Sequence, residues 1–166
     1  MGFNKTLQTV GKQAFYGCSA LTSVALPDGV SFIGYRAFAE CLALTKFVMP
    51  DSVTLLESLV FENDINLNAV TLSRGLEEIP DSLFYGCETL RNVDIPNGVR
   101  TIGESVFGGC YALNRVYIPA SVYSIAKSSF ASTTALDEVD YGGNYEDFFL
   151  IEIAEGNEYL IAAFMK

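Results

Sequence analysis

Apolar residues recur along the chain with a period of 23 residues. The most regular position is a phenylalanine, and a leucine stands six residues after each one. The phenylalanines of this column are Phe15, Phe38, Phe61, Phe84, Phe107 and Phe130. A strict period of this length predicts a solenoid, in which each coil buries its apolar face against the next. We therefore expect the phenylalanine column to line a continuous core.

Each repeat contains two short segments with an extended pattern. In "LTSVALP" (21–27) apolar residues alternate with small or polar ones, which predicts a half-buried strand that the proline ends. "GVSFIG" (29–34) predicts a second short extended segment, and "YRAFAEC" (35–41) is too short for a helix and predicts a turn. Strands one coil apart are expected to lie parallel, about 4.8 Å from each other.

The repeat resembles that of a known family. Its unit, L-x-x-V-x-L-P-x-x-V-x-x-I-G-x-x-A-F-x-x-C, is similar to the BspA-like class of leucine-rich repeats over about residues 7–141. The resemblance implies a right-handed, β-dominated solenoid of the α/β horseshoe type, with a parallel sheet on one face and short second strands and turns elsewhere. The aromatic-rich segment 139–163 resembles the ending that closes such arrays. We expect repeats over 1–136, the first incomplete, and a C-terminal cap over 137–166 that continues the solenoid.

The first repeat begins at its second segment, with Leu7 and Val10 in the repeat columns. Its own first strand would lie before residue 1. An uncovered solenoid end exposes unpaired strand edge and apolar surface. We therefore expect the chain to be a segment of a longer protein, and self-association through the N-terminal end is expected if that edge is exposed.

Net charge narrows the range of partners. The chain has a formal charge of -10 and a pI near 4.3, and residues 137–166 hold 8 acidic residues and 1 basic residue. Non-specific binding to nucleic acid or to an anionic membrane needs basic patches, so we predict neither. The late apolar stretch 147–164 is interrupted by charges every few residues, so we predict no membrane insertion.

The sequence lacks the usual signatures of a catalytic site. No histidine is present, which removes the commonest general base, the commonest metal ligand and every Ser-His or Cys-His pair. No G-x-S-x-G, nucleotide-binding glycine loop or H-E-x-x-H motif occurs. We predict that the chain is not an enzyme and that it has no catalytic residue, no metal ligand and no cofactor.

Cysteines occupy one column, the third position after the phenylalanine. They are Cys18, Cys41, Cys87 and Cys110. One cysteine per coil forms a line, whereas a zinc site needs ligands that converge on one point. We expect a structural column of buried free thiols. A disulfide between neighbouring coils, Cys18–Cys41 or Cys87–Cys110, is the alternative, because adjacent coils bring Cα atoms within bridging distance.

The third coil, 61–84, departs from the repeat at several columns. Asp64 stands in the cysteine column, Ser73 replaces the proline and Pro80 replaces the glycine. The oxygen-rich run "ENDIN" (62–66) is a candidate calcium loop, because carboxylate and amide oxygens gather there. A solvated corner is the interpretation that we favour.

The outward positions of the first strand are those that the repeat leaves free to vary. Extended sheet faces of solenoids are their usual binding surfaces, and arginine and tyrosine are favoured in interfaces. We expect partner contacts from Lys46, Arg91, Asn92, Asp94, Arg115 and Tyr117. The family resemblance implies a protein-binding or adhesion module of an exported bacterial surface protein. Its location would be extracellular or on the cell surface, and its ligand a host or bacterial surface protein. A structural spacer that carries another domain of a longer protein is the alternative.

Overall fold

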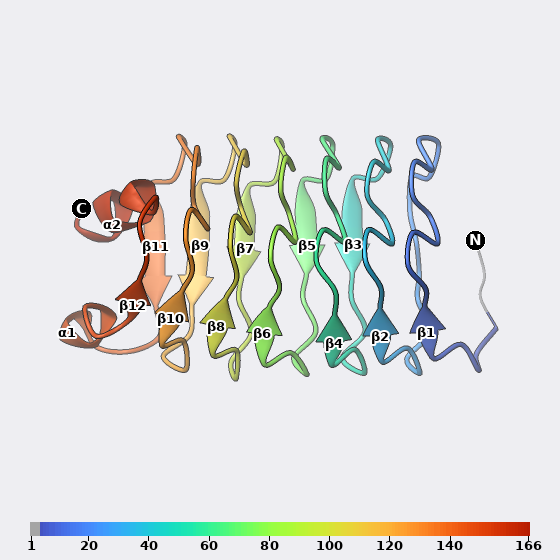
Figure 1. Cartoon of the computed structure of the whole chain (residues 1–166), viewed down its shortest axis with the longest axis horizontal. Coiled ribbons are helices and arrows are strands. Elements are labelled where there is room, and N and C mark those ends of the chain that lie inside the picture. The colour runs from blue at the N-terminus through green and yellow to red at the C-terminus, as the bar shows by residue number, and fades with distance from the viewer. Residues whose placement is uncertain (1–3) are drawn as a thin grey trace.

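The computed structural model describes residues 4–166, and in it the chain winds into a stack of coils (Figure 1). One face of the stack is a five-stranded parallel sheet in the order β11-β9-β7-β5-β3. Its strands are β3 (Lys46–Val48), β5 (Ala69–Thr71), β7 (Asn92–Asp94), β9 (Arg115–Ile118) and β11 (Glu138–Tyr141). The predicted parallel sheet on one face of a solenoid is confirmed.

The opposite face carries the second strand of each coil, two residues long. These strands form a three-stranded sheet, β1-β2-β4, and a four-stranded sheet, β12-β10-β8-β6. They are β1 (Thr9–Val10), β2 (Phe32–Ile33), β4 (Leu55–Leu56), β6 (Glu78–Ile79), β8 (Thr101–Ile102), β10 (Ser124–Ile125) and β12 (Glu152–Ile153). The prediction of an extended segment within 29–34 is confirmed by β2.

The strand predicted for 21–27 is wrong. That segment forms no strand, and the five-stranded sheet starts one coil later at β3. Among residues 4–166 the segment has a neighbouring coil on one side only, and no backbone hydrogen bond joins it to β3. Val24 is nevertheless buried, so the apolar column persists without the ladder. At the same end β1 pairs with β2 alone within these residues, and self-association there stays a prediction.

The phenylalanine column forms the centre of the core. Rings in successive coils stack with centroids 5.1 Å apart between Phe15 and Phe38, 5.6 Å between Phe61 and Phe84, and 5.7 Å between Phe84 and Phe107. Phe15 is partly buried, and the other members of the column are fully buried. Each aromatic pair contributes about 0.5–1.5 kcal/mol beyond the area it buries, so the column stabilises every coil through its neighbours.

Two residues with left-handed backbone build the turn around each phenylalanine. One lies two positions before the ring and the other two positions after it, as in Ser82 (φ 54°) and Gly86 (φ 74°) around Phe84. The same two positions have positive φ in every coil from Gln13 to Ser132. Left-handed residues cannot continue a helix, so the segment 35–41 forms the predicted turn.

The third coil interrupts the second face. In other coils the residue after the second strand donates its N–H to the previous coil, as Gly103 does to the Ile79 carbonyl at 2.8 Å. Pro80 stands at this position and has no N–H to give to Leu56. The second face is therefore split between β4 and β6. On the first face β5 and β7 share a single register pair, Ala69 with Asn92.

Residues after β11 replace the coil that would come next. β12 pairs with β10, and α2 (Glu158–Phe164) packs against β11. The helix α1 (Tyr145–Phe148) lies between β11 and β12 in the sequence. In the repeats, the backbone N–H of each phenylalanine of the column from Phe38 to Phe107 donates to a carbonyl of the next coil. For Phe130 that acceptor is the buried side-chain oxygen of Asn157, at 3.0 Å. The amide nitrogen of Asn157 donates to the carbonyls of Ala126 and Ala154, which fixes its orientation.

We predict that Phe84→Ala lowers the free energy of unfolding by about 3–5 kcal/mol, as expected for truncation of a buried aromatic residue. Phe84 stacks on rings in both neighbouring coils. Phe15→Ala is the matched control and should cost less, because Phe15 is only partly buried. Urea denaturation followed by circular dichroism measures both values. Equal and small effects would contradict a stacked core.

Candidate functional site

Side chains at alternate positions of β3, β5, β7, β9 and β11 point outward from the five-stranded sheet. Parallel pairing aligns them in two rows across the strands. The first row is Lys46, Ala69, Asn92, Arg115 and Glu138, and the second is Val48, Thr71, Asp94, Tyr117 and Asp140. We call these ten residues the sheet face. Five of the six predicted contact residues lie on it.

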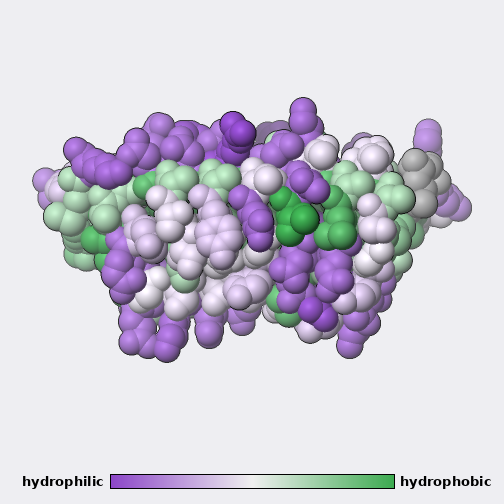
Figure 2. All heavy atoms as spheres, turned by 90° about the horizontal axis from the view of Figure 1, so that it is seen from above, coloured by the Kyte–Doolittle hydropathy of each residue, from purple (hydrophilic) through white to green (hydrophobic). Residues whose placement is uncertain are grey.

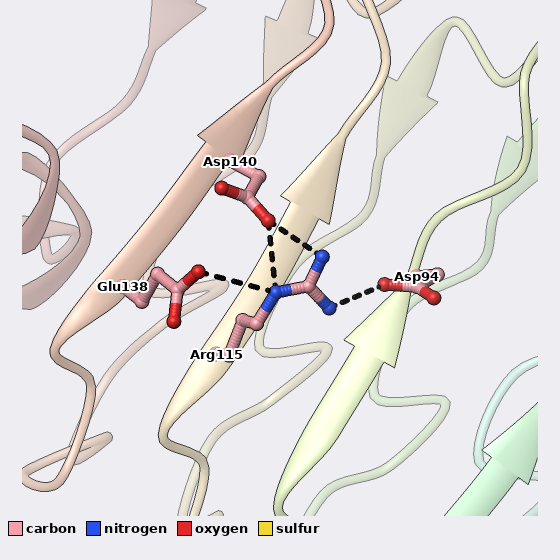
Figure 3. A network of polar contacts seen from close by, with 4 residues as sticks. All are labelled: Asp94, Arg115, Glu138 and Asp140. Carbon is pink, nitrogen blue, oxygen red and sulfur yellow. Dashed lines mark hydrogen bonds and ion pairs between the residues drawn. The ribbon is translucent and has the colours of Figure 1, made fainter.

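Arg115 is the centre of a polar network on this face (Figure 3). Its Nη1 lies 2.8 Å from Asp94 on β7, and its Nε donates to Asp140 on β11 at 2.8 Å. The Nε also lies 3.4 Å from a carboxylate oxygen of Glu138. The hydrogen bonds to Asp94 and then Asp140 raise the pKa of Arg115. One guanidinium therefore orders three carboxylates, and two negative charges remain uncompensated.

A depression of about 770 Å³ crosses the sheet face from β3 to β9. Its lining includes Val48, Thr71, Asp94 and Tyr117, together with corner residues that follow the strands. Val48 is an apolar side chain with 64% of its surface exposed. The Tyr117 hydroxyl donates to the side-chain oxygen of Asn97 at 3.3 Å, which directs the ring across the depression. The depression therefore exposes the apolar Val48 on β3 and the charged Asp94 on β7 and Arg115 on β9.

Arg91 does not lie with Arg115 and Tyr117. It lines a separate depression of about 570 Å³ near the start of the strands, with polar neighbours that include Thr45 and Asn68. The sequence places it one residue before β7, outside the outward rows. Conversely, Val48 and Thr71 were not among the predicted contacts, although both stand in an outward column. The signal that could have identified Val48 is a large apolar residue where the column is otherwise small or polar.

Three cysteines of the column, Cys41, Cys87 and Cys110, are buried, and a complete turn of the previous coil lies next to each of them. The Sγ of Cys41 donates to the Phe15 carbonyl at 3.2 Å, and Cys87 and Cys110 make the same bond to the phenylalanine of the previous coil. All four cysteines are free, and Cys18 alone is exposed, which departs from the expected buried column. Burial raises the pKa of Cys41 and of Cys110 to about 12, so these thiols stay protonated and unreactive.

Asp64 occupies the same column in the third coil and is completely buried. Its Oδ1 accepts the Cys41 N–H at 2.7 Å, and its Oδ2 has no hydrogen-bond partner. Burial raises the pKa of the Asp64 carboxyl to about 8, although the bond from the Cys41 N–H acts in the opposite direction. The carboxyl is therefore mostly neutral at pH 7. An inward, neutral carboxyl does not fit the calcium loop that the run 62–66 offered as an alternative.

Glu62 in the same run is also engaged, because it forms an ion pair with Arg36 of the previous coil. Across residues 4–166 no group of three or more histidine, cysteine, aspartate or glutamate side chains is placed to hold a metal ion. Within the same residues, neither helix has the length and apolar character needed to cross a membrane.

The turns after the phenylalanines form a long side of the molecule, seen from above in Figure 2. Hydrophilic side chains gather along its two long margins, and paler, less polar side chains lie between them (Figure 2). Exposed Leu42, Ile65, Tyr85 and Tyr111 belong to these turns. The Tyr85 ring lies over Gly108, where an added Cβ would come within 2.9 Å of the ring. The tyrosine therefore contributes to packing between coils.

Comparison with known proteins places the repeat in a recognised group. The family model described as "BspA type Leucine rich repeat region" matches residues 1–114 and 54–148 and finds six copies. No curated protein is significantly similar to the chain.

Solved structures share the fold. The leucine rich repeat protein TpLRR of T. pallidum is 32% identical, with a TM-score of 0.78, over 81% of this chain and 63% of that one. A leucine rich cell surface protein of Faecalibacterium prausnitzii is 24% identical, with a TM-score of 0.63, over 90% and 61%. A leucine-rich repeat protein of Bacteroides ovatus is 19% identical, with a TM-score of 0.54, over 94% and 56%. The chain thus spans about three fifths of the length of these proteins, and the last two show the fold alone.

We predict that Ellman's reagent modifies one thiol in the native protein and four after denaturation. Cys18 is exposed, while the other three are buried with a raised pKa. The variant Cys18→Ser should react at no thiol while folded. Fewer than four reactive thiols in the denatured parent would show a disulfide, and rapid modification of a second native thiol would contradict the buried column.

The unpaired carboxyl of Asp64 predicts a pH-dependent stability. Folded Asp64 keeps its proton up to about pH 8, whereas the unfolded chain loses it near 3.8. Between these values the folded state binds the extra proton, so the free energy of unfolding falls as the pH rises, by up to about 1.4 kcal/mol per pH unit. Asp64→Cys, which restores the column, should remove this slope and raise stability at pH 8.

Urea denaturation at several pH values, for the parent and for Asp64→Cys, measures this difference. Glu77→Gln, at an exposed carboxylate, is the matched control and should follow the parent. Parallel curves for the parent and Asp64→Cys would show that Asp64 is not the titrating group.

Proposed function

The chain belongs to the BspA-type leucine-rich repeat family, and from this premise we propose that it binds a partner protein through the sheet face. The observation that carries the proposal is the depression of about 770 Å³ across β3, β5, β7 and β9. Its lining combines side chains of positions that vary between repeats, such as Val48, Thr71 and Tyr117, with repeating corner residues such as Pro50 and Pro96. A leucine-rich repeat solenoid is typically a non-enzymatic scaffold, which agrees with a role in protein interaction.

The proposal also covers the location of the protein and its division into repeats and cap. It includes a bacterial surface location and a role in adhesion, as the family resemblance implies, and one protein of the same fold is described as a leucine rich cell surface protein. The division into repeats over 1–136 and a cap over 137–166 is part of the same proposal. It is supported by Asn157, which provides Phe130 with the acceptor that another coil would supply.

The network around Arg115 refines the predicted contacts. Arg115 is bound to three carboxylates, so we assign it to positioning Asp94 and Asp140 rather than to direct contact. Val48, Thr71 and Tyr117 line the depression and are assigned to contact. Lys46 and Asn92 remain proposed contacts in the first row, and Arg91 remains a proposed contact of the neighbouring depression.

The test is site-specific photo-crosslinking. A photoreactive amino acid is placed at Thr71 on the sheet face or at Glu78 on β6, which is also exposed but lies on the opposite face. Each protein is irradiated with purified fibronectin, laminin or collagen, and with detergent-extracted bacterial surface proteins. We expect covalent adducts from position 71 and none from position 78. Equal adducts from both positions would contradict binding by the sheet face, and no adduct from either would favour the spacer.

A further inference from the structure

Charges on the sheet face are separated along the solenoid axis. Lys46 on β3 is exposed, and no carboxylate within residues 4–166 forms an ion pair with it. At the opposite end, Asp94, Glu138 and Asp140 share one guanidinium and leave a net charge of two negative units. The exposed pair of Arg74 with Asp51 at the margin is neutral as a whole. The face therefore carries a positive charge at β3 and a net negative charge over β7 to β11.

Between these ends the face is small and uncharged. Ala69 and Thr71 on β5 are exposed and have short side chains. Val48 stands beside them, with 64% of its surface in contact with solvent. A short floor beside an exposed apolar wall suits an apolar side chain, whose burial removes both surfaces from water. From β3 to β7 the face thus carries Lys46 and Val48, then the short side chains of β5, and then Asp94.

The two signs of charge lie on different strands, Lys46 on β3 and Asp94 on β7, with the short side chains of β5 between them. Adjacent strands lie about 4.8 Å apart, so β3 and β7 are about 10 Å apart and β3 and β11 about 19 Å apart. An extended peptide advances about 3.3 Å per residue, so about three residues reach from Lys46 to Asp94 and about six reach β11. The central strands are hydrogen-bonded on both sides, so such a peptide meets side chains and not a free strand edge.

We propose that the sheet face binds an extended segment of a partner protein that lies across the strands and carries an acidic, an apolar and a basic residue in spatial order. The acidic residue pairs with Lys46, the apolar residue lies against Val48 over Ala69 and Thr71, and the basic residue lies at Asp94. This assignment rests on the proposed function. A polyanion does not fit, because it would meet the carboxylates on β7 and β11 and a chain of net charge -10.

The experiment selects ligands without assuming a sequence. Phage that display random linear dodecapeptides are selected on the immobilised 166-residue protein at low ionic strength. The enriched peptides are synthesised, and their affinities are measured by calorimetry for the parent and for Lys46→Glu, Val48→Asp and Glu78→Lys. Glu78→Lys on β6 is the matched control for a charge change on the opposite face. These positions are exposed, and each variant is required to show the melting curve of the parent.

We expect the enriched peptides to share an acidic, an apolar and a basic residue, spaced so that the acidic residue reaches Lys46 on β3 and the basic residue reaches Asp94 on β7. Lys46→Glu and Val48→Asp should each weaken binding about fivefold or more, and Glu78→Lys should leave it unchanged. Affinity should also fall at physiological salt, because exposed charge pairs are screened there.

Other outcomes separate the two proposals. Peptides that depend on Val48 but lack the charge order, or that are acidic throughout, would overturn this inference and leave binding by the sheet face intact. Peptides indifferent to Val48→Asp, or a failure to enrich any peptide, would also overturn this inference, whereas the adducts at positions 71 and 78 decide the proposed function.

Discussion

Backbone hydrogen bonds between residues one repeat apart determine what every other part of the molecule can do. The N–H of Phe84, for example, donates to the carbonyl of Val106 at 3.0 Å, and equivalent bonds join the other coils. Because such bonds align each position with its own counterpart, a side chain in the core always has its repeat neighbours above and below. Only residues that pack well against copies of themselves suit such a column. Phenylalanine rings stack, and thiols donate to a carbonyl of the previous coil, so both recur.

The same constraint explains why most of the fold could be predicted. The spacing of Phe15, Phe38 and their successors identifies the columns, and the alternation within each unit places the two faces. The pattern does not show whether a segment will form backbone hydrogen bonds with a neighbouring coil. The segment 21–27 has the sequence of a strand but forms no ladder, and Cys18 has the position of a buried thiol but is exposed. Both outcomes depend on neighbouring coils and not on local sequence.

The candidate site was predictable to a smaller extent. Alternation assigns Lys46, Asn92 and Asp94 to the outward rows, and the structure agrees. The roles of long side chains could not be derived in this way. Arg115 has carboxylates on both neighbouring strands within reach and is bound by them, a choice among partners that the sequence does not rank. Arg91 differs because it lies just before β7, where strand alternation no longer determines direction.

The missing N–H of Pro80 has a mechanical consequence. A solenoid pulled along its axis carries the load through bonds between adjacent coils, and the weakest joint yields first. Here the second face is split between β4 and β6, and the first face shares one register pair between β5 and β7. The two interruptions lie on opposite sides of the third coil, β4/β6 before it and β5/β7 after it (Figure 1), so each junction keeps its pairing on the other face. An axial load would therefore pass mainly through one sheet at each of these two junctions, whereas junctions paired on both faces share it between two sheets.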